Sequence, residues 1–141
     1  MTDDDVAALE QALTALRRRQ RRNTLAGDRP LADIWAVEVA DVVAAAPGPT
    51  RVADVAAALG VDPSQASRRV SAAVTAGLVS RGALQSDGRV SVLTLTARGR
   101  RALEQVRARR RDLAAGATRH WSATDRRRLA ILLQRFVDDL D

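Results

Sequence analysis

The segment from residue 50 to residue 99 constrains the fold more than any other part of the chain, because helix and turn signals follow one another closely within it. An amphipathic stretch over residues 51–59 predicts a short helix that ends at Gly60. A second helix is predicted over residues 63–76. It ends at Gly77, because glycine adopts the left-handed C-terminal conformation without a Cβ clash. A tight turn therefore joins the two predicted helices.

The start of the second helix carries a strong N-terminal signal. Asp62 suits the N-cap position, because its carboxylate accepts backbone N–H groups that have no partner inside the helix. Pro63 costs nothing at the first helical position, and Gln65 at the third position can reach back to the cap. The beginning of this helix is therefore predicted to the residue.

A β-hairpin is predicted after the second helix. Two alternating segments, at about 78–84 and 90–95, flank a polar turn at residues 86–89. Both faces of the later segment carry apolar residues, so either Val92 or Leu93 could point inward. Helix, tight turn, helix and hairpin is the order of a winged helix-turn-helix, whose second helix enters the DNA major groove.

Composition and length fit one cytoplasmic domain. A chain of 141 residues can bury a core, and a hydrophobic content of 46% argues against general disorder. No apolar run approaches the roughly 20 residues of a membrane span, and the acidic N-terminus lacks the basic start of a secretory signal. We expect a cytoplasmic, nucleoid-associated protein with no membrane partner.

The inventory of reactive side chains argues against an enzyme. The chain has no Cys, and its single histidine, His120, cannot build a histidine metal site, although carboxylates alone could hold a hard cation. No glycine-rich phosphate loop and no pair of carboxylates in a catalytic arrangement is present. We therefore expect no catalytic residue, no cofactor and no metal.

Charge is unevenly spread along the chain, with net values of −2 over residues 1–49, +3 over residues 50–99 and +5 over residues 100–141. The net charge is +6, and residues 50–99 carry six Arg against three Asp. A basic module suits a polyanionic partner, because neutralised phosphates release their counterions. Positive charge also favours solubility alone, so the charge by itself leaves both interpretations open.

Four further helices are predicted around the module, over residues 3–22, 31–46, 97–119 and 123–140. The first and the last two carry apolar stripes that the winged module does not need, and a second copy of the chain is the simplest partner for them. The expected dimerisation residues are Val6, Leu9, Leu13, Leu16, Leu113, Leu129, Leu132, Leu133, Phe136 and Leu140.

The predicted fold is mainly α, with about six helices and a small β-hairpin wing of two to three short strands. We expect a single domain over residues 1–141. Its winged helix-turn-helix lobe spans residues 31–99, and its dimerisation helices lie within residues 1–25 and 100–141.

The chain resembles the MarR family of bacterial transcriptional regulators over roughly residues 31–140. The resemblance is carried by residues 59–68, 76–81, 87–89 and 95–100, in this order and at the family's spacing. It implies a homodimer whose two winged lobes read a palindromic operator in double-stranded DNA. It also implies release by a small aromatic acid or other lipophilic ligand, bound between the dimerisation region and the DNA-binding lobe.

Candidate DNA-contacting residues lie in the first turns of the predicted recognition helix. Ser64, Gln65, Ser67 and Arg68 occupy the part of such a helix that meets base edges. Glutamine pairs with adenine and arginine with guanine, although Gln65 could serve only the cap and Arg68 could be merely solvated. Arg69 stands where many relatives have an apolar residue, so it either adds a phosphate contact or points sideways from the core.

Two further places complete the candidate interface. Arg89 in the wing resembles the arginine that the family inserts into the minor groove, and Asp87 would orient the wing, although an ordinary Asp-Gly turn is the alternative. Residues 82–85 lack the charges usual in the wing. Thr50 and Arg51, before the helix of residues 51–59, could supply N–H and side-chain contacts to a phosphate.

Other conspicuous residues have simpler interpretations. Trp35 and Val39 could line an effector pocket, although core packing is the alternative. The arginine-rich runs at residues 17–22 and 107–111 fit solvated faces or inter-helix ion pairs better than a nucleic-acid patch.

Two other functions of the protein stay open: a winged-helix module for protein–protein interaction, and a non-specific, nucleoid-associated DNA binder.

Overall fold

The computed structural model describes residues 2–25 and 31–140, which form six helices and one two-stranded antiparallel hairpin. The elements are α1 (Asp3–Leu25), α2 (Leu31–Ala45), α3 (Val52–Leu59), α4 (Pro63–Thr75), β1 (Val79–Leu84), β2 (Asp87–Leu95), α5 (Ala97–Ala117) and α6 (Ala123–Asp138). The predicted fold class, mainly helical with a small hairpin wing, is confirmed.

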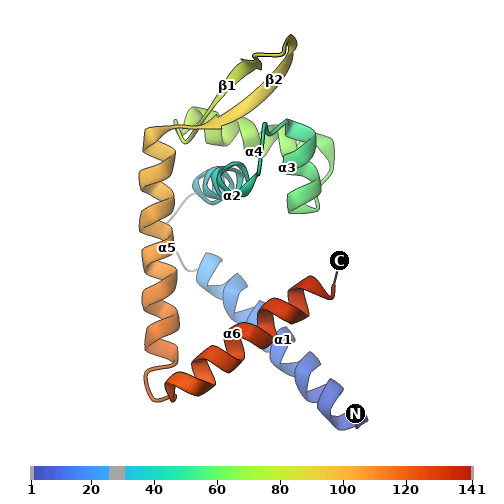
Figure 1. The fold of residues 1–141 in the computed structure, drawn as a ribbon, viewed down its shortest axis with the longest axis vertical. Coiled ribbons are helices and arrows are strands. Elements are labelled where there is room, and N and C mark those ends of the chain that lie inside the picture. The colour runs from blue at the N-terminus through green and yellow to red at the C-terminus, as the bar shows by residue number, and fades with distance from the viewer. Residues whose placement is uncertain (1, 26–30, 141) are drawn as a thin grey trace.

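The elements gather at two ends of an elongated molecule (Figure 1). α2, α3, α4 and the hairpin form a lobe at one end, and α5 runs from that lobe along one side. α1 and α6 lie at the other end, where they cross in the view of Figure 1. None of the helices described here is long and apolar enough to cross a lipid bilayer.

The core of the lobe is built mainly from valines and alanines. α2 provides three of its buried residues, α3 one and α4 two, and the hairpin and α5 close it. Its members are Ala36, Val39, Ala40, Val55, Val70, Ala73, Leu78, Val79, Leu93 and Leu103. Small side chains let α2 and α4 approach closely, and close packing then depends on complementary shapes.

Two glycines end the helices of the helix-turn-helix as predicted. Gly60 and Gly77 adopt left-handed φ values of 63° and 74°. After α4, the Gly77 N–H donates to the Val74 carbonyl at 3.0 Å and the Leu78 N–H donates to the Ala73 carbonyl at 3.0 Å. This pair of bonds is a Schellman motif, in which only glycine avoids a Cβ penalty.

The wing differs in detail from the prediction. β2 begins at Asp87 rather than Val90, because Leu84 pairs with Asp87 while Ala83 pairs with Ser91, so β2 bulges between them. The turn therefore lies at residues 85–86, and the predicted turn at 86–89 was wrong. Leu93 points inward, since only 5% of it is exposed, and Val92 is half-buried.

α5 is anchored to the lobe at its first turn. Thr96 caps the helix, because its hydroxyl accepts the Gly99 N–H at 2.9 Å, and the same hydroxyl donates to the Gly77 carbonyl at 2.6 Å. Gly99 is buried, and a Cβ at this position would collide with the carbonyl oxygen of Leu78. The close approach of α5 to the end of α4 therefore requires glycine.

Helix starts agree with prediction better than helix ends do. α1 extends to Leu25, so the predicted loop of residues 23–30 was wrong for its first three residues, and residues 26–30 lie outside the described part. α2 and α4 end one residue early, and α5 and α6 end two residues early, at Ala117 and Asp138.

Candidate nucleic-acid interface

α4 presents one buried face and one exposed face. Ala66, Val70 and Ala73 are buried against the lobe. Four polar residues of its first half are exposed on the other side, as predicted: Ser64, Gln65, Ser67 and Arg68. The helical period thus separates an apolar face that fixes the helix from a polar face that is open to a ligand.

The exposed face keeps most of its hydrogen-bonding capacity. The side chains of Gln65, Ser67 and Arg68 make no hydrogen bond or short ion pair with any described residue. Ser64 is committed locally, because its hydroxyl donates to Asp62 at 2.8 Å. An amide, a hydroxyl and a guanidinium are therefore available together on one helix face.

Asp62 fixes the beginning of this helix. Its carboxylate accepts the Gln65 N–H at 2.9 Å, as a cap should. This backbone hydrogen bond, followed by the hydrogen bond from the Ser64 hydroxyl, holds the pKa of Asp62 below its ordinary value of 3.8. The cap is therefore a carboxylate at neutral pH. Gln65 makes no side-chain bond back to it, so the predicted reciprocal half is absent among the described contacts.

Arg69 does not belong to the exposed face. Its Nη1 atom lies 2.6 Å from Oε2 of Glu38, and its guanidinium carbon lies 5.5 Å from the centre of the Trp35 ring. Both partners belong to α2. The phosphate contact predicted for Arg69 is not favoured by this arrangement, because a carboxylate already pairs with its charge. The alternative, that it points sideways from the core, is confirmed.

The residues before α3 are also less available than predicted. Thr50 is only 2% exposed, and its carbonyl accepts the Leu93 N–H at 2.7 Å, which adds a one-residue bridge beside the hairpin. A DNA contact by the Thr50 side chain was therefore a wrong prediction. Arg51 is the exposed N-cap of α3, but its N–H donates to Oδ2 of Asp54 at 2.7 Å. Of the contacts predicted for Arg51, only that of its side chain is still available to DNA.

The wing carries two exposed arginines. The Arg89 N–H donates to Oδ1 of Asp87 at 3.0 Å, so Asp87 orders the bulge as expected of a residue that orients the wing. The side chain of Arg89 makes no hydrogen bond or ion pair within the described chain. Arg81 on β1 is likewise exposed and unpaired within the described chain, although the sequence did not single it out as a DNA contact. Its place within the first predicted wing strand was the available signal.

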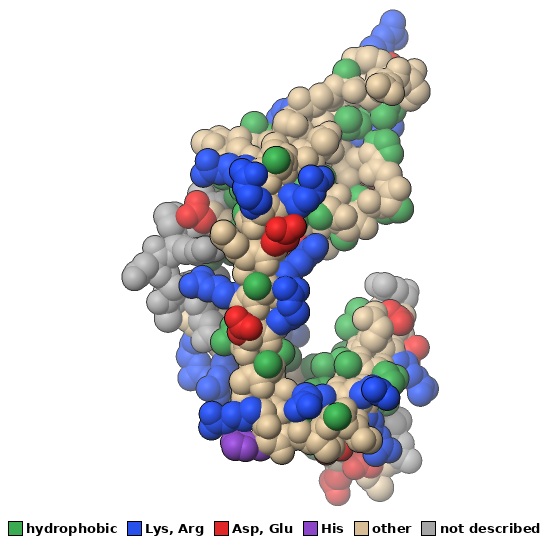
Figure 2. Space-filling model, turned by 60° about the vertical axis from the view of Figure 1, so that its left-hand side comes forward, with side chains coloured by type: hydrophobic (Ala, Val, Ile, Leu, Met, Phe, Trp, Pro, Cys, Tyr) green, Lys and Arg blue, Asp and Glu red, His purple; other side chains and the backbone are tan. Residues whose placement is uncertain are grey.

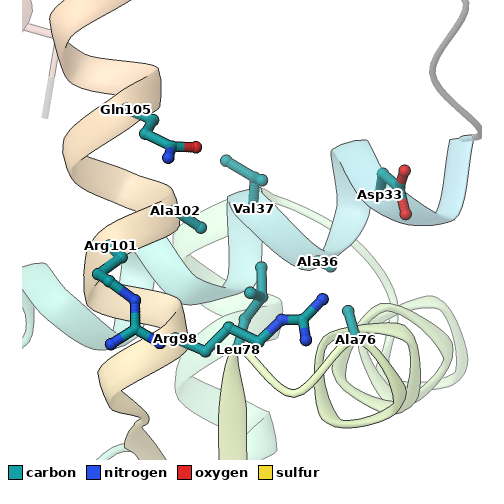
Figure 3. A pocket seen from close by; sticks show the side chains of 9 residues that line it. All are labelled: Asp33, Ala36, Val37, Ala76, Leu78, Arg98, Arg101, Ala102 and Gln105. Carbon is teal, nitrogen blue, oxygen red and sulfur yellow. The ribbon is translucent and has the colours of Figure 1, made fainter.

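A cavity of about 370 Å³ lies between α2, the end of α4 and the first half of α5 (Figure 3). Its lining is Asp33, Ala36, Val37, Ala76, Leu78, Arg98, Arg101, Ala102 and Gln105. In Figure 3 the side chain of Arg98 extends from α5 toward Ala76. Arg98 and Arg101 make no ion pair with a described residue, so two free guanidinium groups border an otherwise mixed surface.

The predicted pocket residues were wrong for this cavity. Val39 has no exposed surface and belongs to the core. Trp35 faces Arg69 of α4 instead, and neither residue is part of the lining. Both lie on α2, which also supplies residues 33, 36 and 37 to the lining, but these three face the cavity instead. The sequence indicated the right helix and the wrong side of it.

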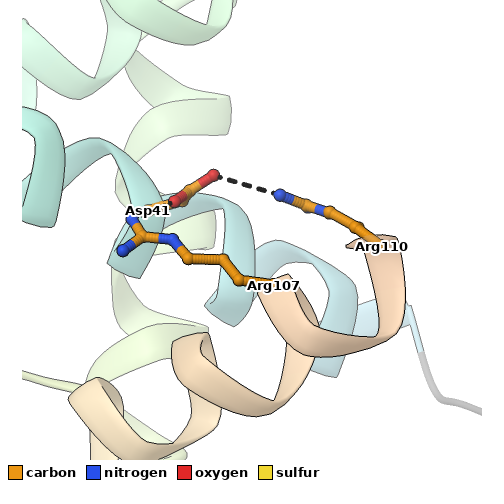
Figure 4. Close-up of polar contacts among 3 residues, drawn as sticks. All are labelled: Asp41, Arg107 and Arg110. Carbon is orange, nitrogen blue, oxygen red and sulfur yellow. Dashed lines mark hydrogen bonds and ion pairs between the residues drawn. The ribbon is translucent and has the colours of Figure 1, made fainter. Parts of the chain in front are cut away.

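A second contact joins α2 to α5. Asp41 lies 3.0 Å from Nη2 of Arg107 and 3.4 Å from Nη1 of Arg110 (Figure 4). The prediction of inter-helix ion pairs for the run at residues 107–111 is confirmed for these two arginines. Arg109 and Arg111 are exposed and unpaired within the described chain, and Figure 2 shows basic side chains along α5.

The end of the molecule away from the wing exposes apolar surface. None of the residues of α6, all of which are described, is buried. Figure 2 shows hydrophobic side chains gathered at this end. Most predicted dimerisation residues are exposed, from 39% to 69%, namely Val6, Leu9, Leu16, Leu113, Leu129, Leu132, Leu133 and Leu140. Leu13 and Phe136 are half-buried.

Comparison with known proteins finds similarity to transcriptional regulators. A sequence profile of the MarR family matches residues 33–90. An HTH-type transcriptional regulator of Bacillus subtilis, YxaD, is 33% identical over 95 residues, which is 64% of this chain and 66% of YxaD. The chain thus spans slightly less than two thirds of that relative.

Solved structures agree over nearly the whole chain. A MarR family protein from Bacillus stearothermophilus superposes with a TM-score of 0.78 at 20% identity, covering 99% of this chain and 98% of the other. The transcriptional regulator BldR from Sulfolobus solfataricus gives a TM-score of 0.72 at 18% identity, covering 99% of each chain. At such identities the structural similarity shows a shared fold.

Proposed function

We propose that this chain, which is similar to regulators of the MarR family, is a homodimeric transcriptional regulator that binds a palindromic operator in double-stranded DNA. The observation that carries this proposal is the outward face of α4. The side chains of Gln65, Ser67 and Arg68 are exposed there together, and none of them has a hydrogen-bond partner in the described chain. Side chains of these types read base edges in the major groove. α4 is therefore the proposed recognition helix.

The proposed dimer follows from the exposed apolar face of α1 and α6. A soluble monomer rarely leaves so many large apolar side chains in contact with water, and a second copy would cover them. A twofold axis would place two α4 helices side by side along one face of the dimer. Two equivalent helices read an inverted repeat, so the operator is proposed to be palindromic.

The wing is proposed to contact the minor groove beside each half-site. Arg89 is exposed and unpaired, and Asp87 orders the bulge that carries it. A narrow A·T-rich minor groove has the most negative potential, so arginine gains most there. Arg81 would add to the positive field of the wing without reading sequence.

We further propose that the regulator is a repressor, released by a small aromatic or lipophilic acid in the cavity between α2 and α5. The cavity is bordered by the unpaired guanidinium groups of Arg98 and Arg101, which suit a carboxylate, and by apolar side chains. Benzoate is a simple probe. It should raise the unfolding temperature of the wild type and weaken DNA binding. An Arg98→Ala variant that responds equally would argue against this cavity.

Selection from a pool of random-sequence duplexes tests the central proposal. The full chain should enrich an inverted repeat whose half-sites lie about one helical turn apart. Salt-dependent retention of DNA without any enriched sequence would instead indicate a non-specific, nucleoid-associated binder. Failure to retain DNA at low salt would favour a winged-helix module for protein–protein interaction. The proposed place of action is the cytoplasm, on the nucleoid.

A further inference from the structure

We propose that Arg69, Glu38 and Trp35 form a positioning contact that sets the rotation of α4 on α2, and so aims the exposed face of α4 at DNA. The inference rests on the proposed function, because it concerns the discrimination of DNA sequences. Arg69 would act through the residues beside it and would not itself touch DNA.

The geometry of the contact is specific. Nη1 of Arg69 lies 2.6 Å from Oε2 of Glu38, and its guanidinium lies over the Trp35 ring at 5.5 Å. Trp35 and Glu38 stand three residues apart on α2, so they share one side of that helix. The side chain of Arg69 is 20% exposed and that of Glu38 is 39% exposed, so the pair is partly shielded from water.

A directional contact adds an orientation constraint to the apolar packing between α2 and α4. The buried residues that α2 and α4 contribute to the core are alanines and valines. Hydrophobic burial is itself non-directional. A planar guanidinium that must face a ring and point at a carboxylate is satisfied over a narrow range of rotation.

The rotation of α4 matters because residues close to Arg69 in the sequence are the ones proposed to contact DNA bases. Arg68 precedes Arg69 and is exposed, while Val70 follows and is buried. Each residue advances the helix by about 100°. Holding Arg69 at the side of α4 therefore fixes the direction of Gln65, Ser67 and Arg68 without contacting them.

The competing interpretation is that Glu38 merely pairs with Arg69, which would otherwise contact a phosphate. The two interpretations predict opposite effects of Glu38→Ala on the affinity for the preferred DNA site. Loss of an acidic residue that only competes with DNA should strengthen binding, because it frees Arg69 and adds positive charge. Loss of a positioning contact should weaken binding to the preferred site while leaving binding to random DNA equal or stronger.

Asp41→Ala is the matched control. Asp41 lies on the same helix, carries the same charge and also pairs with arginines, but those arginines belong to α5. Both substitutions place alanine, a good helix former, in α2. Any effect of charge alone should therefore be the same in the two variants.

The experiment titrates each full-length variant against a duplex selected by the wild type and against random-sequence duplex. Glu38→Ala should lower the ratio of preferred to random affinity roughly two- to fivefold, the size expected when a partly exposed ion pair is lost. Asp41→Ala should leave that ratio unchanged. A Glu38→Ala variant that binds the preferred duplex more tightly would overturn the proposal.

Hydrogen exchange of the DNA-free protein separates this inference from the proposed function. Glu38→Ala should speed amide exchange in α4 more than in α5, and Asp41→Ala should not. The exchanged pair Glu38→Arg with Arg69→Glu re-forms the ion pair without the contact to Trp35, so it should restore part of the slow exchange and part of the affinity ratio. If the wild type prefers no sequence, the proposed function fails, and with it the role in recognition. Unchanged exchange in α4 would overturn the positioning contact itself.

Discussion

The two adjacent arginines of α4, Arg68 and Arg69, have different environments. Arg68 is exposed with no hydrogen bond or short ion pair within the described chain, whereas Arg69 is paired with Glu38. Arg68→Ala should therefore lose about 1–3 kcal/mol of affinity for a selected duplex and relax discrimination at one base pair of each half-site. A fluorescence titration at fixed salt measures both quantities.

Arg111→Ala is the control for Arg68→Ala, because Arg111 is another exposed, unpaired arginine, but it lies on α5. It removes the same charge without touching the proposed reading face. Equal losses for the two variants, with unchanged discrimination, would mean that Arg68 contributes only to the general field of the protein.

Asp62 links the stability of α4 to pH. Its pKa is lowered in the folded chain by the Gln65 N–H and then by the Ser64 hydroxyl. The stabilisation is therefore fully present above the ordinary value of 3.8 and is lost as the pH falls through the lower folded-state pKa. Asp62→Ala should unfold at a lower temperature than the wild type at pH 7, and this difference should shrink in acid.

Asp62→Asn is the matched variant for this test, because asparagine also caps helices but does not titrate. Thermal unfolding followed by circular dichroism between pH 7 and acid compares the three proteins. If the difference in unfolding temperature between the wild type and Asp62→Ala stayed constant until Asp62 was fully protonated, the charge of the cap would not be what stabilises α4.

For single residues, a role that depends on partners nearby in the sequence could be predicted, whereas a role that depends on distant partners could not. The roles of Asp62 and Gly77 follow from chain neighbours alone. Arg69 pairs with a residue 31 positions away, and the burial of Thr50 depends on Leu93. Val39 was placed on the right helix, but which side of α2 faces the cavity is decided only when α5 packs.

Among the elements, the junction of α5 with the lobe is the least tolerant of change. Gly99→Ala should destabilise the fold by about 1–3 kcal/mol or more, because the new Cβ meets the backbone carbonyl of Leu78, which cannot easily shift. Gly116, on the same helix, has open space around it. Gly116→Ala should stabilise the protein by about 0.5–1 kcal/mol.

Denaturant unfolding of the two glycine variants and the wild type measures these changes. The pair separates the intrinsic helix preference of alanine from the packing constraint, since both substitutions lie in α5. A Gly99→Ala variant as stable as the wild type would show that α5 can move away from the lobe at little cost.

Element types and starts were predictable, whereas some boundaries were not. Helix starts depend on capping side chains such as Thr96 and Ser122, which are visible in the sequence. The wing turn depends on strand register, and the sequence allowed several registers because both faces of β2 carry apolar residues. The bulge opposite residues 83–84 therefore appeared only in the folded hairpin.

For the whole molecule, the exposed face of α6 is the feature that most needs a partner. Leu129 lies on the predicted apolar stripe, and Ile131 lies about 200° around the helix from it. Leu129→Glu should weaken dimerisation roughly a hundredfold or more, because an unpaired carboxylate would be buried in the interface. Ile131→Glu should leave the dimer intact. Sedimentation at a series of concentrations distinguishes them, and equal behaviour of both variants would exclude the predicted stripe as the interface.

The claim that joins these scales is that two copies of α4, one from each chain of a dimer, read the two halves of one operator. The most direct measurement compares the affinity of the wild type for a selected palindromic duplex and for the same duplex with one half-site scrambled. We predict two chains on the intact duplex and an affinity that falls close to the random-DNA value when one half is lost, since each half-site supplies part of the specific energy. Equal affinity for the two duplexes, or one chain on the intact palindrome, would contradict the account.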